Sequence, residues 1–147
     1  MLVKLASYIL QRATGFKANR FHQLVMIFGE PNIGERVYIG PFSEIYAKGA
    51  GVIIGDKCDI ASFVSINCAD SHRKCLDLAS ENIRRDITLE HNVFVGSHSL
   101  IKGGAYIGHH TVIAAGTMVD AKKIPPYSLV SGNPMIVKEG YYRAFYD

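Results

Sequence analysis

The sequence is poor in three features that would each have pointed to a particular class of protein. Its three cysteines are an odd number in 147 residues, and no signal peptide precedes them, so we expect reduced thiols and a cytoplasmic location. The formal net charge is only +3, which does not favour nucleic-acid binding. No apolar run reaches the ~18 residues of a membrane-spanning helix. These shortages predict a single soluble domain over 1–147, with 48% hydrophobic residues to form its core.

Acidic residues are missing from the first part of the chain, where none occurs before Glu30. Four basic residues lie there: Lys4, Arg12, Lys17 and Arg20. Apolar residues recur at helical spacing in two sets: Leu2, Leu5 and Ile9, and Val3, Ala6 and Leu10. This pattern predicts an amphipathic helix within an N-terminal cap over 1–24. The helix either packs on the rest of the fold or rests on an anionic membrane surface, and the sequence leaves both open.

Aliphatic residues recur with a period of six along most of the chain. They form three runs: Ile27, Ile33, Ile39 and Ile45; Ile54, Ile60 and Ile66; and Leu89, Val95, Ile101, Ile107, Ile113 and Val119. A period of six fits neither an α-helix nor a hairpin meander. It fits a triangular prism in which each hexad supplies one short strand and one corner, and small residues after the aliphatic position let the backbone turn. We therefore predict an all-β fold with coils over 27–71 and 87–124.

The most regular part of the repeat is IKGGAYIGHHTVIAAGTMV, from Ile101 to Val119, and IPPYSLVSGNP follows it from Ile124 to Pro134. These stretches resemble the hexapeptide-repeat acetyltransferases, in particular the sugar O- and N-acetyltransferases of surface-polysaccharide biosynthesis. The resemblance implies a left-handed parallel β-helix. It also implies a homotrimer with acetyl-CoA in a groove between two prisms, where the loop of one subunit covers its neighbour's site.

The repeat is interrupted between Ile66 and Leu89 by a segment too charged to lie inside a prism. We predict an excursion loop over 72–86, and a C-terminal tail over 125–147. His72 lies where the chain leaves the coil, and the resemblance assigns it the role of general base. A neutral imidazole suits proton removal near neutral pH. Its second ring nitrogen needs a partner, for which Asp70, Asn67, Glu44 and a backbone carbonyl are candidates.

Other chemistries at this loop are less favoured by the spacing. Cys68 and Cys75 are too far apart for a structural zinc pair, and no two histidines have the spacing of the γ-type carbonic anhydrases, so we expect no metal. Cations near Cys75 would activate a thiol, but direct transfer needs no covalent intermediate. Cys58 is expected in the core. The other histidines of the repeat are expected at outward or corner positions, with His98 a secondary candidate for the groove: His91, His98, His109 and His110.

The cofactor end is predicted from the resemblance and from small residues that let a ligand approach the backbone. Pantetheine is expected beside four of them: Gly103, Gly104, Ala115 and Gly116. Lys122, Lys123 and Lys138 either meet the phosphates of the coenzyme or form a solvated edge. The turn that contains Asn133 and Pro134 is expected to border the adenine.

The resulting hypothesis is an acetyl-CoA-dependent enzyme that moves an acetyl group directly to a sugar hydroxyl. Transfer to the amine of a nucleotide-linked amino sugar is the first alternative. A non-catalytic scaffold and a γ-type carbonic anhydrase-like protein are the others. Nothing in the sequence separates the two acceptors, because a polar loop can contact either.

Overall fold

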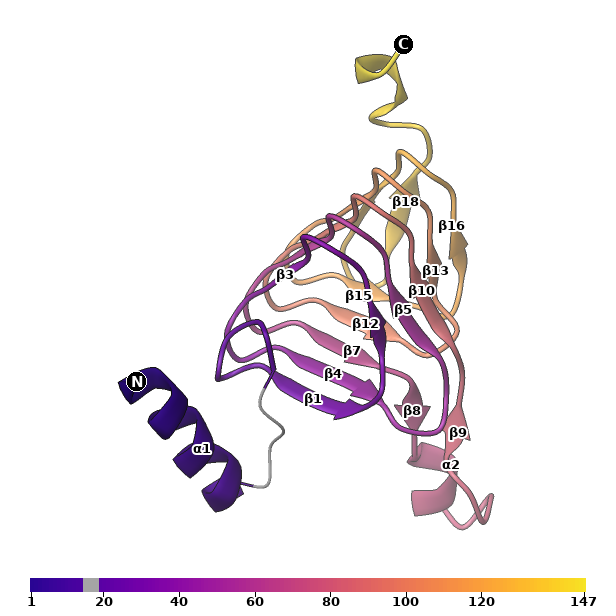
Figure 1. Cartoon of the computed structure of the whole chain (residues 1–147). Coiled ribbons are helices and arrows are strands. Elements are labelled where there is room, and N and C mark those ends of the chain that lie inside the picture. The colour runs from indigo at the N-terminus through magenta and orange to yellow at the C-terminus, as the bar shows by residue number, and fades with distance from the viewer. Residues whose placement is uncertain (15–18) are drawn as a thin grey trace.

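The six-residue units form short strands that stack into three parallel sheets, one on each face of a triangular prism (Figure 1). The computed structural model describes residues 1–14 and 19–147, so the part of the predicted cap at 15–18, with Lys17, lies outside the described residues. Face A holds β1 (Met26–Gly29), β4 (Glu44–Ala47), β7 (Ser65–Asn67), β12 (Leu100–Lys102) and β15 (Met118–Val119). Face B holds β2 (Asn32–Ile33), β5 (Val52–Ile54), β10 (Ile87–Leu89), β13 (Tyr106–Ile107) and β16 (Lys123–Ile124). Face C holds β3 (Tyr38–Ile39), β6 (Asp59–Ile60), β11 (Phe94–Val95), β14 (Val112–Ile113), β17 (Leu129–Ser131) and β18 (Ile136–Lys138).

The predicted parallel β-helix is confirmed by the register of these strands. On face A, Ile66 pairs with Ile45 on one side and with Ile101 on the other, and the three side chains are fully buried. Each fully buried aliphatic side chain of this kind contributes roughly 1.5–3 kcal/mol of hydrophobic stabilisation. The ladder continues through Ile124 on face B to Val130 on face C, both fully buried, so the last coil extends past residue 124. Followed away from the viewer in Figure 1, the chain winds counter-clockwise, which is the left-handed sense.

The interruption after β7 is an antiparallel excursion at the edge between faces A and B. β8 (Ala69–Asp70) pairs with β9 (Ile83–Arg84), and the short helix α2 (His72–Cys75) lies between them. The backbone N–H of Arg85 donates to the carbonyl of Cys68 at 3.0 Å, and the side chain of Arg84 donates to the carbonyl of Lys48 at 3.1 Å. These bonds close the base of the excursion, so that its two ends re-enter the prism side by side.

The two ends of the chain differ in how they meet the prism. α1 (Leu2–Thr14) is the predicted amphipathic helix, and it stands away from the coils in Figure 1. None of the helices in the described parts of the chain has the length and apolar character needed to cross a bilayer. At the other end, β18 turns back antiparallel to β17, and a short 3-10 helix (Arg143–Phe145) follows.

Candidate active site

A pocket of about 420 Å³ opens where the base of the excursion meets the edge between faces A and B. Its walls come from consecutive coils, because Asn67 at the end of β7 is in register with Lys102 at the end of β12. The lining residues are Asn67, Cys68, Ala69, Asp70, His72, Ile83, Arg85, Leu100, Lys102, Gly103 and Ala121. The predicted catalytic residues His72, Asp70 and Asn67 therefore lie in one cavity, together with Gly103 from the predicted cofactor set.

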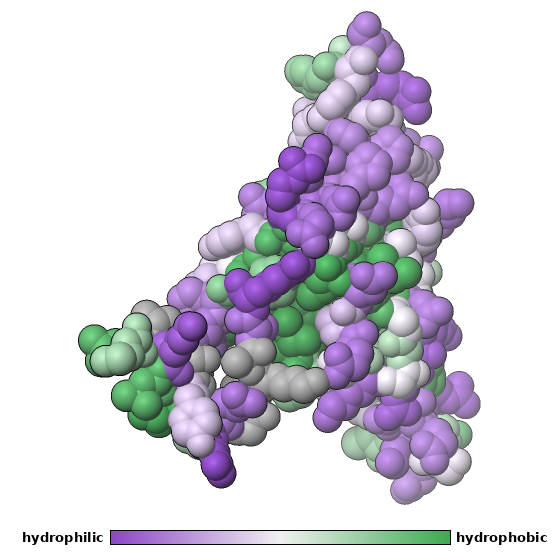
Figure 2. Space-filling view, in the orientation of Figure 1, coloured by the Kyte–Doolittle hydropathy of each residue, from purple (hydrophilic) through white to green (hydrophobic). Residues whose placement is uncertain are grey.

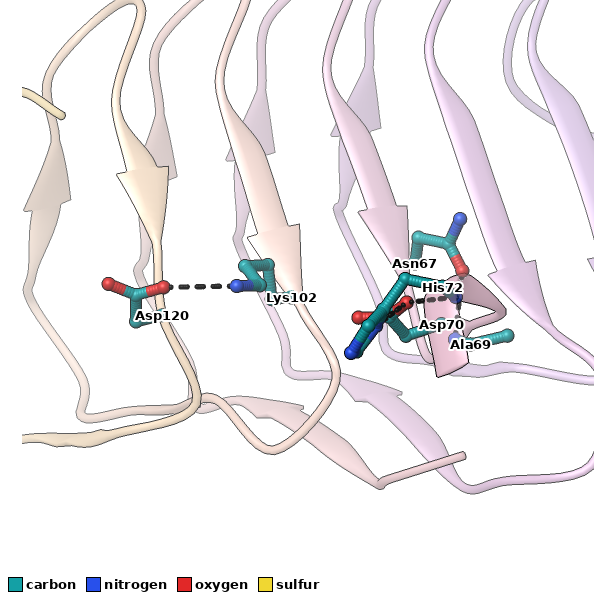
Figure 3. A network of polar contacts seen from close by, with 6 residues as sticks. All are labelled: Asn67, Ala69, Asp70, His72, Lys102 and Asp120. Atoms are coloured by element: carbon teal, nitrogen blue, oxygen red, sulfur yellow. Dashed lines mark hydrogen bonds and ion pairs between the residues drawn. The ribbon is translucent and has the colours of Figure 1, made fainter. Parts of the chain in front are cut away.

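His72 and Asp70 form a hydrogen-bonded pair at this pocket (Figure 3). The Oδ1 atom of Asp70 lies 2.6 Å from Nδ1 of His72 and accepts the His72 backbone N–H at 3.0 Å. These two bonds, the backbone one first, hold the pKa of Asp70 below its ordinary value, with the positive charge of Lys102 adding to the effect. A carboxylate only accepts hydrogen bonds, so the ring proton belongs on Nδ1 and the lone pair on Nε2 is free.

The other candidate partners of His72 are engaged elsewhere. Oδ1 of Asn67 accepts the backbone N–H of Ala69 at 2.9 Å, which supports the bend from the coil into β8. Glu44 accepts the hydroxyl of Ser65 at 3.3 Å on face A. Asp70 is thus the side chain that orients the imidazole in this structure, and Asn67 shapes the wall beside it.

Two cations at the pocket were not predicted as site residues. Lys102 pairs with Asp120 at 3.2 Å across neighbouring coils, and Arg85 lines the pocket where the chain leaves the excursion. The signal for Lys102 was present in the repeat, because it follows Ile101 as Asn67 follows Ile66. The cavity therefore combines a histidine–carboxylate pair with positive charge.

The predicted cofactor residues are divided between two edges of the prism. Gly103 and Gly104 lie at the edge between faces A and B, where a Cβ on Gly103 would approach the Cys68 carbonyl oxygen to 2.7 Å. Lys122 and Lys123 follow Ala121 onto face B. Ala115 and Gly116 are exposed at the edge between faces C and A, as are Asn133 and Pro134 after β17. One chain therefore does not bring the two sets together.

The two buried cysteines and the corner histidines take part in packing. Cys58 is buried in the core as predicted, and burial raises the pKa of the Cys68 thiol, which opposes nucleophilic chemistry there. The corner histidines stack on aromatic rings: His98 on Phe63 with ring centroids 4.9 Å apart, and His91 on His109 at 4.8 Å. Across residues 1–14 and 19–147, no group of three or more His, Cys, Asp or Glu side chains is placed to hold a metal ion.

Comparisons with known proteins agree on one family. Residues 32–68 and 86–121 match the hexapeptide repeat of succinyl-transferase. Galactoside O-acetyltransferase of Escherichia coli K12 is 38% identical over 105 residues, which cover 70% of this chain and 50% of the relative. The present chain thus spans about half the length of that enzyme.

Solved structures of similar proteins share the prism. A hexapeptide-repeat acetyltransferase of Vibrio cholerae, complexed with acetyl coenzyme A, superposes with a TM-score of 0.70 at 26% identity, covering 88% of this chain and 73% of that one. AntD, an N-acyltransferase from Bacillus cereus, gives 0.75 at 19% identity and 86% and 71% coverage, a likeness of fold alone. The chain belongs to the hexapeptide-repeat acetyltransferase family.

Proposed function

We propose that this protein transfers an acetyl group from acetyl-CoA to a sugar hydroxyl, with His72 as the general base. The observation that carries the proposal is the His72–Asp70 pair at the mouth of the pocket. The pair fixes the tautomer of the imidazole and leaves Nε2 free to accept a proton. The similarity to a galactoside O-acetyltransferase and to an acetyltransferase solved with acetyl coenzyme A supports this choice of donor and acceptor.

The proposed reaction is a direct transfer. Nε2 of His72 takes the hydroxyl proton as the acceptor oxygen attacks the thioester carbonyl carbon, and a tetrahedral oxyanion forms. Asp70 stabilises the imidazolium that results, because its carboxylate stays ionised beside the ring. Collapse of the intermediate breaks the carbon–sulfur bond, and the imidazolium returns the proton to the departing coenzyme thiolate. No protein thiol takes part, in agreement with the buried state of Cys68.

The division of the cofactor residues supports the predicted homotrimer. A coenzyme that contacts both sets must lie between two chains, with Gly103 and Gly104 supplied by one and Ala115 and Gly116 by its neighbour. Cyclic association of three prisms offers three equivalent grooves of this kind. The excursion of one subunit would cover its neighbour's groove. We place this assembly in the cytoplasm, where the cysteines stay reduced.

The acceptor is proposed to lie on face A, on the side of His72 toward the N-terminal coils. Phe28, Tyr46 and Asn67 are in register there on successive coils, and the rings of Phe28 and Tyr46 are 5.6 Å apart. Aromatic rings next to hydrogen-bonding side chains suit a sugar, whose C–H groups pack against a ring while its hydroxyls bond to neighbouring polar groups. Lys48, whose Nζ lies 5.6 Å from the centroid of the Phe28 ring, is one such donor. The coenzyme would then approach from the Gly103 side.

The proposal is tested by release of free coenzyme A thiol from acetyl-CoA, with a panel of sugars and amino sugars as acceptors. We expect turnover with hydroxyl acceptors, and a 10²- to 10⁴-fold lower kcat for His72→Ala. His91→Ala is the matched control, because His91 is an exposed histidine at the edge between faces B and C. Full activity of His72→Ala on the best acceptor would show that the general-base assignment is wrong. Turnover confined to amino sugars would replace O-transfer by N-transfer.

A further inference from the structure

The apolar face of α1 is uncovered in this structure. Leu2, Leu5 and Ile9 keep 80%, 55% and 56% of their surface exposed, and they lie on one side of the helix. Figure 2 shows green side chains on α1 and a separate green area at the end of the prism that faces the viewer. Three large aliphatic side chains on one helix face form the kind of exposed apolar surface that marks an interaction site. This face is therefore a candidate interaction surface.

The charge around this face is of one sign. Lys4 and Arg12 lie beside it on the helix, and α1 contains no acidic residue. Tyr8 stands between the two cations, and Arg12 Nε donates to its hydroxyl at 3.2 Å. Aliphatic residues flanked by cations and a tyrosine suit the boundary between acyl chains and anionic headgroups.

The length of α1 fits a helix that lies in such a boundary. Its 13 residues extend about 20 Å at 1.5 Å per residue, short of the hydrocarbon thickness of a bilayer. A helix of this length is too short to span a bilayer, and at a membrane it would lie in the plane of the headgroups with its apolar side toward the acyl chains.

Two protein surfaces compete for the same face and are less suited to it. The hollow of about 260 Å³ at the first coil has apolar side chains such as Ile27 and Ile33 in its lining, but Arg20 and Glu30 also line it. An aliphatic helix face that docked there would have to cover these charged groups. Contact between α1 helices of two copies would bring like charges together, since each carries Lys4 and Arg12 and no acid. An anionic surface neutralises those charges instead.

From the uncovered aliphatic face and its cationic border, we propose that α1 docks this protein on membranes rich in anionic lipid. The inference is independent of the proposed acetyl transfer, because it uses no residue of the pocket. The test is co-sedimentation of the full chain with vesicles of phosphatidylcholine alone, or of phosphatidylcholine mixed with phosphatidylglycerol. We expect binding to the mixed vesicles, little binding to phosphatidylcholine, and loss of binding as salt is raised.

Two double variants separate the apolar and the cationic contributions. Leu5→Glu with Ile9→Glu should abolish binding to the mixed vesicles. Lys4→Glu with Arg12→Glu should lower the partition coefficient by more than roughly 25-fold, because each lost cation costs about fivefold and the anionic surface repels each new carboxylate. Lys138→Glu with Arg143→Glu is the matched control, since it changes the net charge equally at the far end of the chain (Figure 1).

The proposal is overturned if wild-type protein binds both vesicle types equally or neither. It is also overturned if the control pair weakens binding as much as the α1 cation pair, because overall charge would then be responsible. Mass and melting temperature of the Leu5→Glu/Ile9→Glu variant are measured alongside. A change of oligomeric mass or a lower melting temperature, with vesicle binding intact, would assign the face to a second copy or to the prism.

Discussion

The residues inside the prism repeat from coil to coil, whereas the residues of the excursion at its edge do not. Inside, Ile66 and Ile101 occupy equivalent positions in neighbouring coils, and each is held by the rung above and the rung below. In the excursion, His72 and Asp70 have no equivalents in neighbouring coils, and the side chains of both are about half exposed (59% and 48%). Repetition thus carries the stability of the molecule, while the proposed catalytic residues lie where the repeat is interrupted. Changes in the two regions should therefore separate stability from activity.

The largest effect on stability is expected inside the ladder. Ile101→Ala removes a fully buried side chain between two coils and should lower the free energy of unfolding by roughly 2–5 kcal/mol, because the parallel strands cannot close the cavity. Ile101→Val is the graded control, with an expected loss of roughly 0.5–1.5 kcal/mol. Urea unfolding followed by circular dichroism measures both. A loss below that of the valine control would show that the coils can collapse into the gap.

The next largest effect is expected on activity, with little change in stability. Asp70→Asn should lower kcat roughly 10- to 100-fold, because an amide can donate to Nδ1 of His72 and favour the wrong tautomer. The melting temperature should stay near that of the wild type, since the side chain is half exposed. Steady-state kinetics and a thermal melt on the same preparation check both. An unchanged kcat would show that Asp70 does not contribute to catalysis.

A smaller effect is expected at the junction between the two regions. Arg84→Ala removes the bond to the Lys48 carbonyl, which fastens the excursion to the preceding coil, and should cost about 1 kcal/mol locally. Amide exchange at Arg85, whose N–H bonds to Cys68, should accelerate while exchange at Ile101 does not change. Equal acceleration at both amides would mean that the excursion and the ladder open together.

The smallest effect concerns a polar pair on the outer surface of the coils. Tyr106 donates a hydrogen bond to Glu90. Burial alone would raise the pKa of Glu90, but the bonds from Tyr106 and from the His109 backbone N–H bring it below its usual value. The hydrogen bond to Glu90, with some burial, raises the pKa of Tyr106.

The sign of each shift gives the pH window. A lowered carboxyl pKa stabilises the fold above pH 4.5, and this contribution is lost as the pH falls through the folded value. A raised phenol pKa stabilises it up to pH 10.0, and this is lost as the pH rises through the folded value. The melting temperature of Tyr106→Phe should therefore lie slightly below that of the wild type between these limits and approach it outside them. A constant difference across the whole range would contradict this assignment.

The fold was largely predictable because a period of six leaves one geometry that buries every aliphatic rung. The phase of the repeat also determines on which edge of the prism each small residue lies. Gly103 follows a face A rung and Gly116 a face C rung, so their separation onto two edges follows from counting hexads. Val130, which was predicted to lie in the tail over 125–147, is a buried rung of face C paired with Ile113.

The site was less predictable, because the excursion has no repeat against which to read its residues. His72 could be singled out by its place at the break and by resemblance, whereas the choice of Asp70 as its partner required the backbone turn from β8 into α2, beside the β8–β9 pairing. That pairing has only two residues in each strand, too short to give an alternation of polar and apolar side chains. Arg85 follows β9 directly and lines the pocket for that reason, and no spacing in the sequence predicts this position.

The reversal of direction at β18 has a consequence for how these prisms behave in a crowded solution. A parallel coil leaves its last strand with free backbone donors and acceptors, and a second molecule could add its own first coil there and grow a head-to-tail fibre. On face C, β18 occupies that position antiparallel to β17, through Val137 opposite Val130. On this face, β18 therefore covers the strand edge to which a second molecule would otherwise add.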